Sequence, residues 1–202
     1  MAGPEPTVDW LRRRFAAGAG PDLASEDDGA ARAPGGALTP ASVLVPIVSH
    51  ERELTVLFTR RTAHLRDHSG QISFPGGRAE PGDESPRSTA LREAREEIGL
   101  DAARIEVLGC LPDYRTRTGF RVTPVVSLVA PPLELRPDAF EVDEVFEVPL
   151  AFLLDPANHQ RHSREIQGRR ADFYAIPYRD YYIWGATAGM VVNLYRFLAA
   201  RS

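Results

Sequence analysis

Three glutamates in one short run, Glu93, Glu96 and Glu97, are spaced so that they could bind a divalent cation. Residues four apart lie on the same side of a helix, so Glu93 and Glu97 are stacked and Glu96 lies beside them. Like charges at this spacing destabilise a helix by about 0.2–0.5 kcal/mol per pair, and a cation relieves that repulsion. Oxygen ligands in this number suit Mg²⁺ or Mn²⁺. The alternative interpretation is an acidic helix face in solvent, with Arg92 and Arg95 as partners.

A helix is predicted to carry these glutamates. Ser85 is a suitable N-cap, Pro86 fits the first helical position, and Gly99 can end the helix in a left-handed conformation. Four apolar residues fall on one side of the helical wheel and predict a buried face: Ala90, Leu91, Ala94 and Ile98. The preceding turn begins with two glycines and contains three further acids: Gly76, Gly77, Glu80, Asp83 and Glu84.

The stretch from Gly77 to Leu100 resembles the Nudix box, the signature of hydrolases that cleave nucleoside diphosphates linked to another group. Its second half, Arg92-Glu93-x-x-Glu96-Glu97-x-Gly99, matches residue for residue. In the first half, five residues separate Gly77 from an acid, as expected, but the acid is Asp83 rather than Glu, and eight residues rather than seven lie between it and Arg92. Alternatively, Glu84 keeps the seven-residue spacing and the glycine position falls on Arg78. One extra residue in the turn explains both alignments.

A second motif lies upstream and resembles the coenzyme A pyrophosphatase branch of the Nudix family. It consists of Leu57-Phe58-Thr59-Arg60-Arg61-Thr62, then Arg66, Gly70 and Phe74-Pro75-Gly76-Gly77 at the family's spacings. The departures are Phe58 in place of Leu and Thr62 in place of Ser. Two linked motifs are far more specific than either alone, and the resemblance extends loosely over residues 40–200.

The resemblance implies an α/β fold, the Nudix-type α/β/α sandwich with a mixed central sheet, with the motif helix on one side and a C-terminal helix on the other. It implies metal-dependent hydrolysis of coenzyme A, or its thioesters, to 3′,5′-ADP and 4′-phosphopantetheine or its acylated form. Mg²⁺ or Mn²⁺ would be the cofactor. Two alternatives are a Nudix pyrophosphatase for another substrate, such as ADP-ribose, a nucleotide sugar or a nucleoside triphosphate, and a non-catalytic nucleotide-binding module.

The resemblance also assigns roles to the acidic cluster. Glu93 and Glu97 would hold the metal, with Glu96 as a further ligand or a positioning group, and Arg92 would hold the glutamates in place. The family often supplies one more carboxylate from a later strand, and Glu144 or Glu141 could be that group. The general base could be Glu93 or Glu144.

Substrate-binding residues are expected in two polar loops and at the glycine pair. Arginines bind phosphates in a bidentate manner, which favours Arg61 and Arg66 in the loop over residues 60–70. In the loop over residues 112–119, Tyr114 could stack on a base, and Arg115 or Arg117 could contact a phosphate. His64 and His68 are weaker candidates. Gly76 and Gly77 would let the backbone approach the phosphates.

The 202-residue chain is predicted to consist of a short helix with a flexible connector, residues 1–39, and a hydrolase domain, residues 40–202. The connector is rich in Gly, Ala, Pro and Asp. Apolar patterns predict strands over residues 41–48, 54–59, 105–111, 120–130, 141–150, 171–176 and 181–184. Helices are predicted over residues 8–17, 150–154 and 186–200.

Composition excludes several classes of function. A net charge of −4 gives no basic surplus for nucleic acid, and no apolar run approaches the 18 residues of a membrane span. The single cysteine, Cys110, excludes an internal disulfide and a cysteine-based zinc site, and it is expected in the core. No signal peptide is evident. We therefore expect a cytoplasmic enzyme with a small-molecule substrate, and a homodimer is compatible with the sequence.

Overall fold

The computed structural model describes residues 6–18, 37–63, 70–166 and 169–200. Its main sheet has eight strands, in the order β3-β2-β1-β7-β5, with β4 paired to β1, β6 to β7, and β8 to β2. The strands are β1 Thr39–Ser49, β2 Leu54–Arg61, β3 Ile72–Ser73, β4 Gly76–Arg78, β5 Ile105–Cys110, β6 Tyr114–Arg115, β7 Phe120–Val129 and β8 Val142–Pro149. β1 and β7 run parallel, whereas the other pairs are antiparallel, so the sheet is mixed as predicted.

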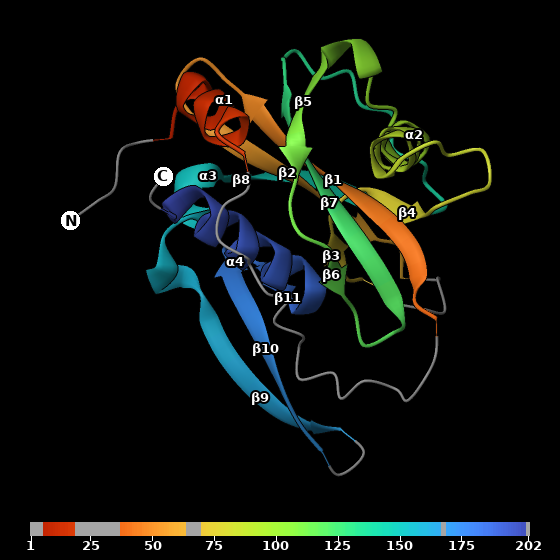
Figure 1. Cartoon of the computed structure of the whole chain (residues 1–202), viewed down its shortest axis with the longest axis vertical. Coiled ribbons are helices and arrows are strands. Elements are labelled where there is room, and N and C mark those ends of the chain that lie inside the picture. The colour runs from red at the N-terminus through yellow and green to blue at the C-terminus, as the bar shows by residue number, and fades with distance from the viewer. Residues whose placement is uncertain (1–5, 19–36, 64–69, 167–168, 201–202) are drawn as a thin grey trace.

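Helix α2, Pro86–Ile98, covers one face of this sheet (Figure 1). Ser85 and Ser88 form a reciprocal capping box at its start, and Gly99 ends it with φ of 66°. Its buried residues Ala90, Ala94 and Ile98 pack against Leu44, Val48, Leu57, Val125 and Val129 of the sheet. The predicted buried face is therefore confirmed, and it fixes which side of α2 the glutamates occupy.

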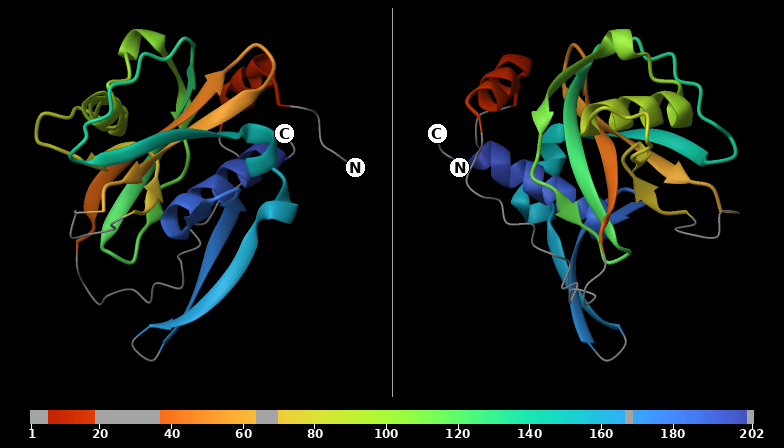
Figure 2. Two further views of the ribbon diagram at one scale, coloured as in Figure 1. Left: turned by 180° about the vertical axis from the view of Figure 1, so that it is seen from behind. Right: turned by 45° about the vertical axis from the view of Figure 1, so that its right-hand side comes forward.

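Helix α4, Gly185–Ala199, lies on the opposite face of the sheet (Figure 2). The short helices α1, Val8–Ala16, and α3, Leu150–Leu153, join the same hydrophobic cluster. Leu11 of α1 is fully buried in this cluster. The α/β/α sandwich expected from the sequence is therefore confirmed. The predicted connector between α1 and β1 falls largely on residues 19–36, which are outside the described residues.

A second, three-stranded sheet leaves the body of the molecule as a long arm (Figure 1). It consists of β9 Gln160–Ile166, β10 Arg169–Tyr178 and β11 Tyr181–Trp184. The sequence predicted the central part of β10 and the whole of β11, but it did not predict β9. Its polar sequence, QRHSREI, has no apolar alternation, and pairing with β10 along seven residues defines the strand instead.

The end of β5 differs from the expectation drawn from the sequence. Cys110, expected in the core, is exposed at the end of β5. Strand β5 lies at an edge of the sheet, and its pairing with β7 is irregular between Val107 and Gly109, so the apolar run around Cys110 does not form a buried central strand. Among the described residues, no helix combines the length and the apolar character that crossing a bilayer requires.

Candidate active site

Arg92 of α2 connects the acidic residues of the turn with those of the helix. Its Nε lies 3.1 Å from Asp83 Oδ1, and its Nη2 lies 3.0 Å from Asp83 Oδ2. Its Nη1 lies 3.0 Å from Glu93 Oε1 and 2.9 Å from Glu96 Oε2. A further bond runs from Nη2 to the carbonyl oxygen of Arg78. Arg92 is therefore a positioning residue, and its charge is already used within the cluster.

Asp83, rather than Glu84, is the acid that pairs with Arg92. The Asp83 carboxylate also accepts hydrogen bonds from the Thr89 hydroxyl at 3.0 Å and from the Glu80 amide at 2.9 Å. The Arg92 hydrogen bonds, followed by that amide, hold the pKa of Asp83 well below its usual range. Glu84 is exposed. The structure thus favours the alignment in which the turn carries one extra residue after Asp83. No sequence motif pointed to Thr89, which is fully buried.

Close packing against the backbone of β1 requires glycine at position 76, and Gly77 lies against the carboxylate of Glu93. A Cβ on Gly77 would lie 2.7 Å from Glu93 Oε2, and one on Gly76 would lie 2.6 Å from the Cα of Val43. Both distances are shorter than real Cβ atoms allow. The Gly76 amide donates a hydrogen bond to Glu97 Oε2 at 3.2 Å. The turn and the helix therefore meet at Glu93 and Glu97.

Glu97 is a buried carboxylate, and the positive charge near it does not offset the cost of burying its ionised form. Its side chain is 7% exposed. Burial is the main reason that its pKa is raised to about 8, and repulsion from Glu93 and Glu141 adds to the shift, against the Gly76 hydrogen bond and the Arg61 charge. Burial also raises the pKa of Glu93, although Arg92 opposes this. A cation between these carboxylates would lower both values.

The end of β2 lies beside this cluster. Arg61 Nη1 is 4.0 Å from Glu97 Oε1, a long ion pair across the sheet edge. The Thr62 amide donates to the carbonyl oxygen of Glu141 at 3.0 Å, and the Thr62 hydroxyl donates to that of Phe140 at 2.8 Å. Residues 61–62 therefore bring Glu141 to the same neighbourhood as Glu97. Arg66, His64 and His68 lie outside the described residues.

Glu144 is not part of this neighbourhood, which corrects the preferred assignment from the sequence. It forms an ion pair with Arg60 at 3.0 Å and accepts a hydrogen bond from the Tyr181 hydroxyl at 2.6 Å. The ring of Tyr181 stacks on Phe146, which belongs to the cluster on the α4 face. Side chains alternate along a strand, so Glu144 and Phe146 share the face opposite α2. Glu141, the second alternative, is the carboxylate that the structure brings to Glu93 and Glu97.

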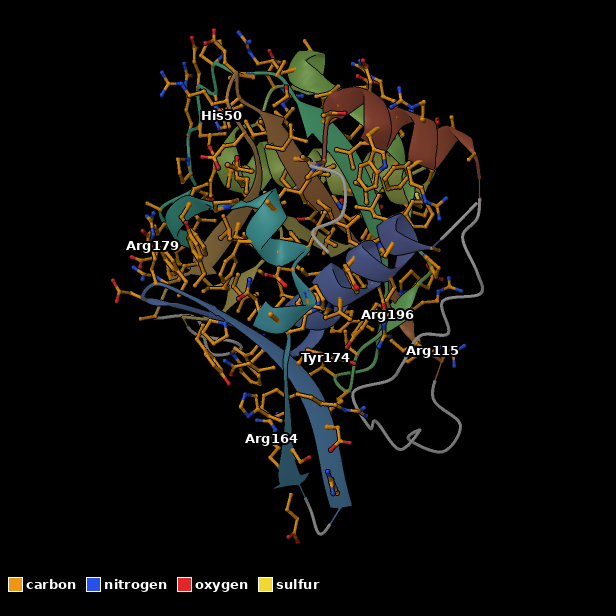
Figure 3. The ribbon with its side chains drawn as sticks, turned by 90° about the vertical axis from the view of Figure 1, so that its left-hand side faces the viewer. His50, Arg115, Arg164, Tyr174, Arg179 and Arg196 are labelled. Carbon is orange, nitrogen blue, oxygen red and sulfur yellow. The ribbon has the colours of Figure 1, made fainter. Side chains whose placement is uncertain are left out.

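Of the two residues predicted to bind substrate from the loop over residues 112–119, Tyr114 is buried and Arg115 is exposed. Tyr114 is 2% exposed and its ring packs against Gly189 of α4, so it has no free face for a base and the expected stacking is wrong. Arg115 is exposed and points outward (Figure 3). Strands β1 and β7 separate its strand, β6, from β4. At the usual spacing between strands, this is about 14 Å. Arg117 is also exposed.

Comparison with known proteins identifies the family. A model of the NUDIX domain matches residues 38–167, which is more than half of the chain. The chain belongs to the Nudix family. It is 42% identical over 154 residues to a Pectobacterium atrosepticum protein described as the uncharacterized Nudix hydrolase NudL, covering 76% of this chain and 80% of that protein. NudL of Escherichia coli K12 is 41% identical over 157 residues, with the same coverage.

Two solved structures resemble part of the chain. The binary complex of Caenorhabditis elegans Ap4A hydrolase has a TM-score of 0.48 at 19% identity, covering 55% of this chain and 80% of that one. The NUDIX domain of Shewanella oneidensis NrtR, complexed with ADP ribose, has a TM-score of 0.45 at 25% identity, covering 59% of this chain and 77% of that one.

Nudix hydrolases generally use divalent metal ions, and the carboxylates fit that chemistry in part. Glu93 and Glu97 repel one another, and oxygen ligands of this kind suit a hard cation. Within the described ranges, however, no three acidic, His or Cys side chains are already arranged to hold an ion. Arg92 holds Glu93 and Glu96, and the Glu96 side chain is 59% exposed. An ion held by Glu93 and Glu97 would therefore share the Glu93 carboxylate with Arg92.

Proposed function

We propose that this Nudix hydrolase cleaves the diphosphate bond of coenzyme A or its thioesters, using Mg²⁺ or Mn²⁺. The products would be 3′,5′-ADP and 4′-phosphopantetheine or its acylated form. The observation that carries the proposal is the junction between the upstream motif and the carboxylates, where Arg61 lies 4.0 Å from Glu97. The motif that resembles the coenzyme A branch is thus attached directly to the reaction centre.

The upstream motif forms the base of a hairpin that leads out from this junction. The Arg61 amide donates to the carbonyl oxygen of Gln71 at 3.0 Å, and the Gly70 amide donates to that of Arg61 at 3.2 Å. Gly70 has φ of 67°, a conformation that favours glycine. Arg61 and Gly70, the described residues on either side of Arg66 in the motif, therefore lie side by side next to Glu97. We propose that Arg61 and Arg66 bind the substrate's phosphates.

A divalent ion would neutralise the anionic diphosphate and lower the pKa of a bound water. Glu93 and Glu97 would hold the ion, and Glu96 would be a further ligand or a positioning group. Either Glu93 or Glu141 would accept the proton of the attacking water. Arg92, anchored by Asp83, would keep Glu93 and Glu96 in place, and the Gly76–Gly77 backbone would border the phosphates.

We further propose a setting for the enzyme. The substrate is a small molecule, the location is cytoplasmic, the active form can be a homodimer, and the hydrolase domain begins at residue 40. We also propose that Arg115, on a strand about 14 Å from β4, contacts a distant phosphate of a long substrate such as coenzyme A.

The test is an incubation of the full chain with coenzyme A and Mg²⁺ or Mn²⁺, with products resolved by chromatography. We expect 3′,5′-ADP and 4′-phosphopantetheine, and a loss of rate by orders of magnitude in Glu97→Gln. ADP-ribose and a nucleoside triphosphate serve as competing substrates. Preferential cleavage of either one would overturn the coenzyme A assignment but keep the hydrolase. No cleavage of any of them with either metal would favour a binding module.

A further inference from the structure

A cavity lies at the C-terminal end of α2, away from the glutamates. Its volume is about 360 Å³, and it is formed by the end of α2, the segment that follows it, and residues 133–136. Small-molecule pockets have volumes of about 300–1,000 Å³. The cavity is therefore large enough for a small organic molecule and much larger than one inorganic ion requires.

The walls of this cavity combine three arginines and two acids, Asp101 and Glu134, with an apolar surface. Arg95, Arg104 and Arg136 supply the cationic groups, and Leu100, Leu133 and Leu135 supply the apolar surface. Leu100 is 2% exposed, so the floor of the cavity is part of the core around α2. Guanidinium groups bind phosphate in a bidentate manner, and leucines favour an apolar group.

Capping of the helix does not explain the arginines, because backbone amides already occupy the last carbonyl groups of α2. The Gly99 amide donates to Arg95 O at 2.9 Å and the Leu100 amide to Ala94 O at 3.3 Å. The loop over residues 136–138 satisfies two more carbonyls: the Arg136 amide donates to Ile98 O and the Asp138 amide to Glu97 O, both at 2.8 Å. The guanidinium groups are therefore not needed as caps.

Neutralisation by neighbouring acids does not explain them either. Asp101 uses Oδ1 to accept a hydrogen bond from the Ala103 amide at 2.9 Å, and Glu134 is exposed. Throughout the described part of the chain, none of the three guanidinium groups lies within 4.0 Å of a carboxylate oxygen. Arg104 donates one 3.4 Å hydrogen bond to Pro131 O and has further N–H donors. Three arginines and two acids thus give the wall a formal charge of +1, and none of its guanidinium groups is paired with a carboxylate of the described residues.

The cavity is separate from the proposed reaction centre. Arg95 is two residues from both Glu93 and Glu97, which places it about 160° around the helix from each. The glutamates face the Gly76–Gly77 turn, whereas Arg95 faces residues 133–136. A ligand in the cavity would therefore not compete with a diphosphate at the glutamates.

We propose that this cavity is a second binding site, specific for a small organic phosphate. The phosphate would pair with Arg95 and Arg136, with Arg104 as a third donor, and the apolar part of the ligand would pack on Leu133 and Leu135. This site is independent of the proposed hydrolytic activity.

The experiment is calorimetric titration of the full chain with phenyl phosphate and, separately, with inorganic phosphate. EDTA is present, so that binding does not depend on a divalent ion at the glutamates. Three proteins are compared: the native chain, Arg95→Ala/Arg136→Ala, and Arg52→Ala/Arg87→Ala. The last pair removes the same charge from exposed arginines outside the cavity. Thermal unfolding of each protein checks that it is folded.

We expect one phenyl phosphate per chain, at least tenfold weaker binding in Arg95→Ala/Arg136→Ala, and a change below twofold in the control pair. Raising the salt concentration should weaken binding, because an exposed ion pair is screened. Inorganic phosphate should bind at least fivefold more weakly than phenyl phosphate. The proposal is overturned if the native chain shows no saturable binding or if both variants bind alike. Equal affinity for inorganic phosphate would contradict an organic ligand.

Discussion

Arg92 and Asp83 are joined by two parallel hydrogen bonds, of 3.1 Å and 3.0 Å, between the guanidinium and both carboxylate oxygens. This pair links the turn to the helix and leaves Nη1 of Arg92 for Glu93 and Glu96. The orientation of Glu93 therefore depends on a residue outside the helix.

Replacing Asp83 should lower activity without removing any group that touches the substrate. In Asp83→Ala, Arg92 loses its anchor and Glu93 its fixed orientation. We expect kcat to fall about 10–100-fold, as for other residues that orient metal ligands, with a smaller change in KM. Steady-state kinetics on coenzyme A measures the two separately. Glu84→Ala is the control, because Glu84 is exposed, and it should stay within twofold; the reverse ranking would reinstate the alternative alignment.

Glu97 should make the metal-free protein less stable as pH rises. Its pKa is about 8 in the folded protein and about 4.3 in an unfolded chain. Between these values the folded state holds a proton that the unfolded state has released, so the free energy of unfolding falls with increasing pH and levels off above pH 8. At 1.36 kcal/mol per pH unit, the effect is at most about 5 kcal/mol.

Glu97→Gln lacks this titration but keeps a similar shape. We expect its Tm to equal that of the native chain near pH 4.5 and to exceed it increasingly up to pH 8, in EDTA. Added Mg²⁺ should stabilise the native chain most at high pH, where the carboxylate is ionised, and should have little effect on the variant. Parallel Tm curves for the two proteins from pH 5 to 8 would show that the pKa of Glu97 is not raised in the folded protein.

Glu141 and Glu144 are a matched pair of carboxylates three residues apart, of which Glu141 lies near Glu93 and Glu97 and Glu144 pairs with Arg60. Glu141→Gln should lower kcat by at least about 100-fold, because the group would bind the ion or accept a proton. Glu144→Gln should leave kcat within threefold and cost about 1 kcal/mol of stability, since its ion pair with Arg60 is partly exposed. Kinetics and thermal unfolding of both variants provide the test, and equal losses of kcat would place Glu144 at the site after all.

Local signals in the sequence were sufficient for helix α2 and its glutamates. Capping residues, an apolar stripe and a terminal glycine act within a few residues of one another, so they can be recognised without knowing the fold. The same is true of the β1–β2 hairpin. The choice between Asp83 and Glu84 was different, because it depended on the path of a turn that the signature does not describe. Only the position of Arg92 relative to that turn decides it.

Contacts between distant segments explain the remaining errors. The sequence suggests a polar loop around Tyr114, but the residue lies in β6 and its burial comes from Gly189 of α4, 75 residues later; a Cβ there would lie 2.7 Å from the tyrosine ring. Glu144 lies in β8 and Glu141 in the turn before it, so which of the two acids approaches the α2 glutamates depends on how β8 pairs with β2. Neither the packing partner nor the register can be read from residue types alone.

Arg60 and Arg61 provide the last prediction, because these adjacent arginines have different surroundings. Arg60 pairs with Asp143 and Glu144, whereas Arg61 faces Glu97. In Arg61→Ala, we expect kcat/KM for coenzyme A to fall about 10–100-fold, corresponding to one charge-assisted contact with phosphate. The acid limb of the pH–rate profile should also move to higher pH, since the Arg61 charge opposes the rise in the pKa of Glu97. Arg60→Ala should keep both the rate and the profile, and a similar loss in both variants would mean that Arg61 does not bind the substrate.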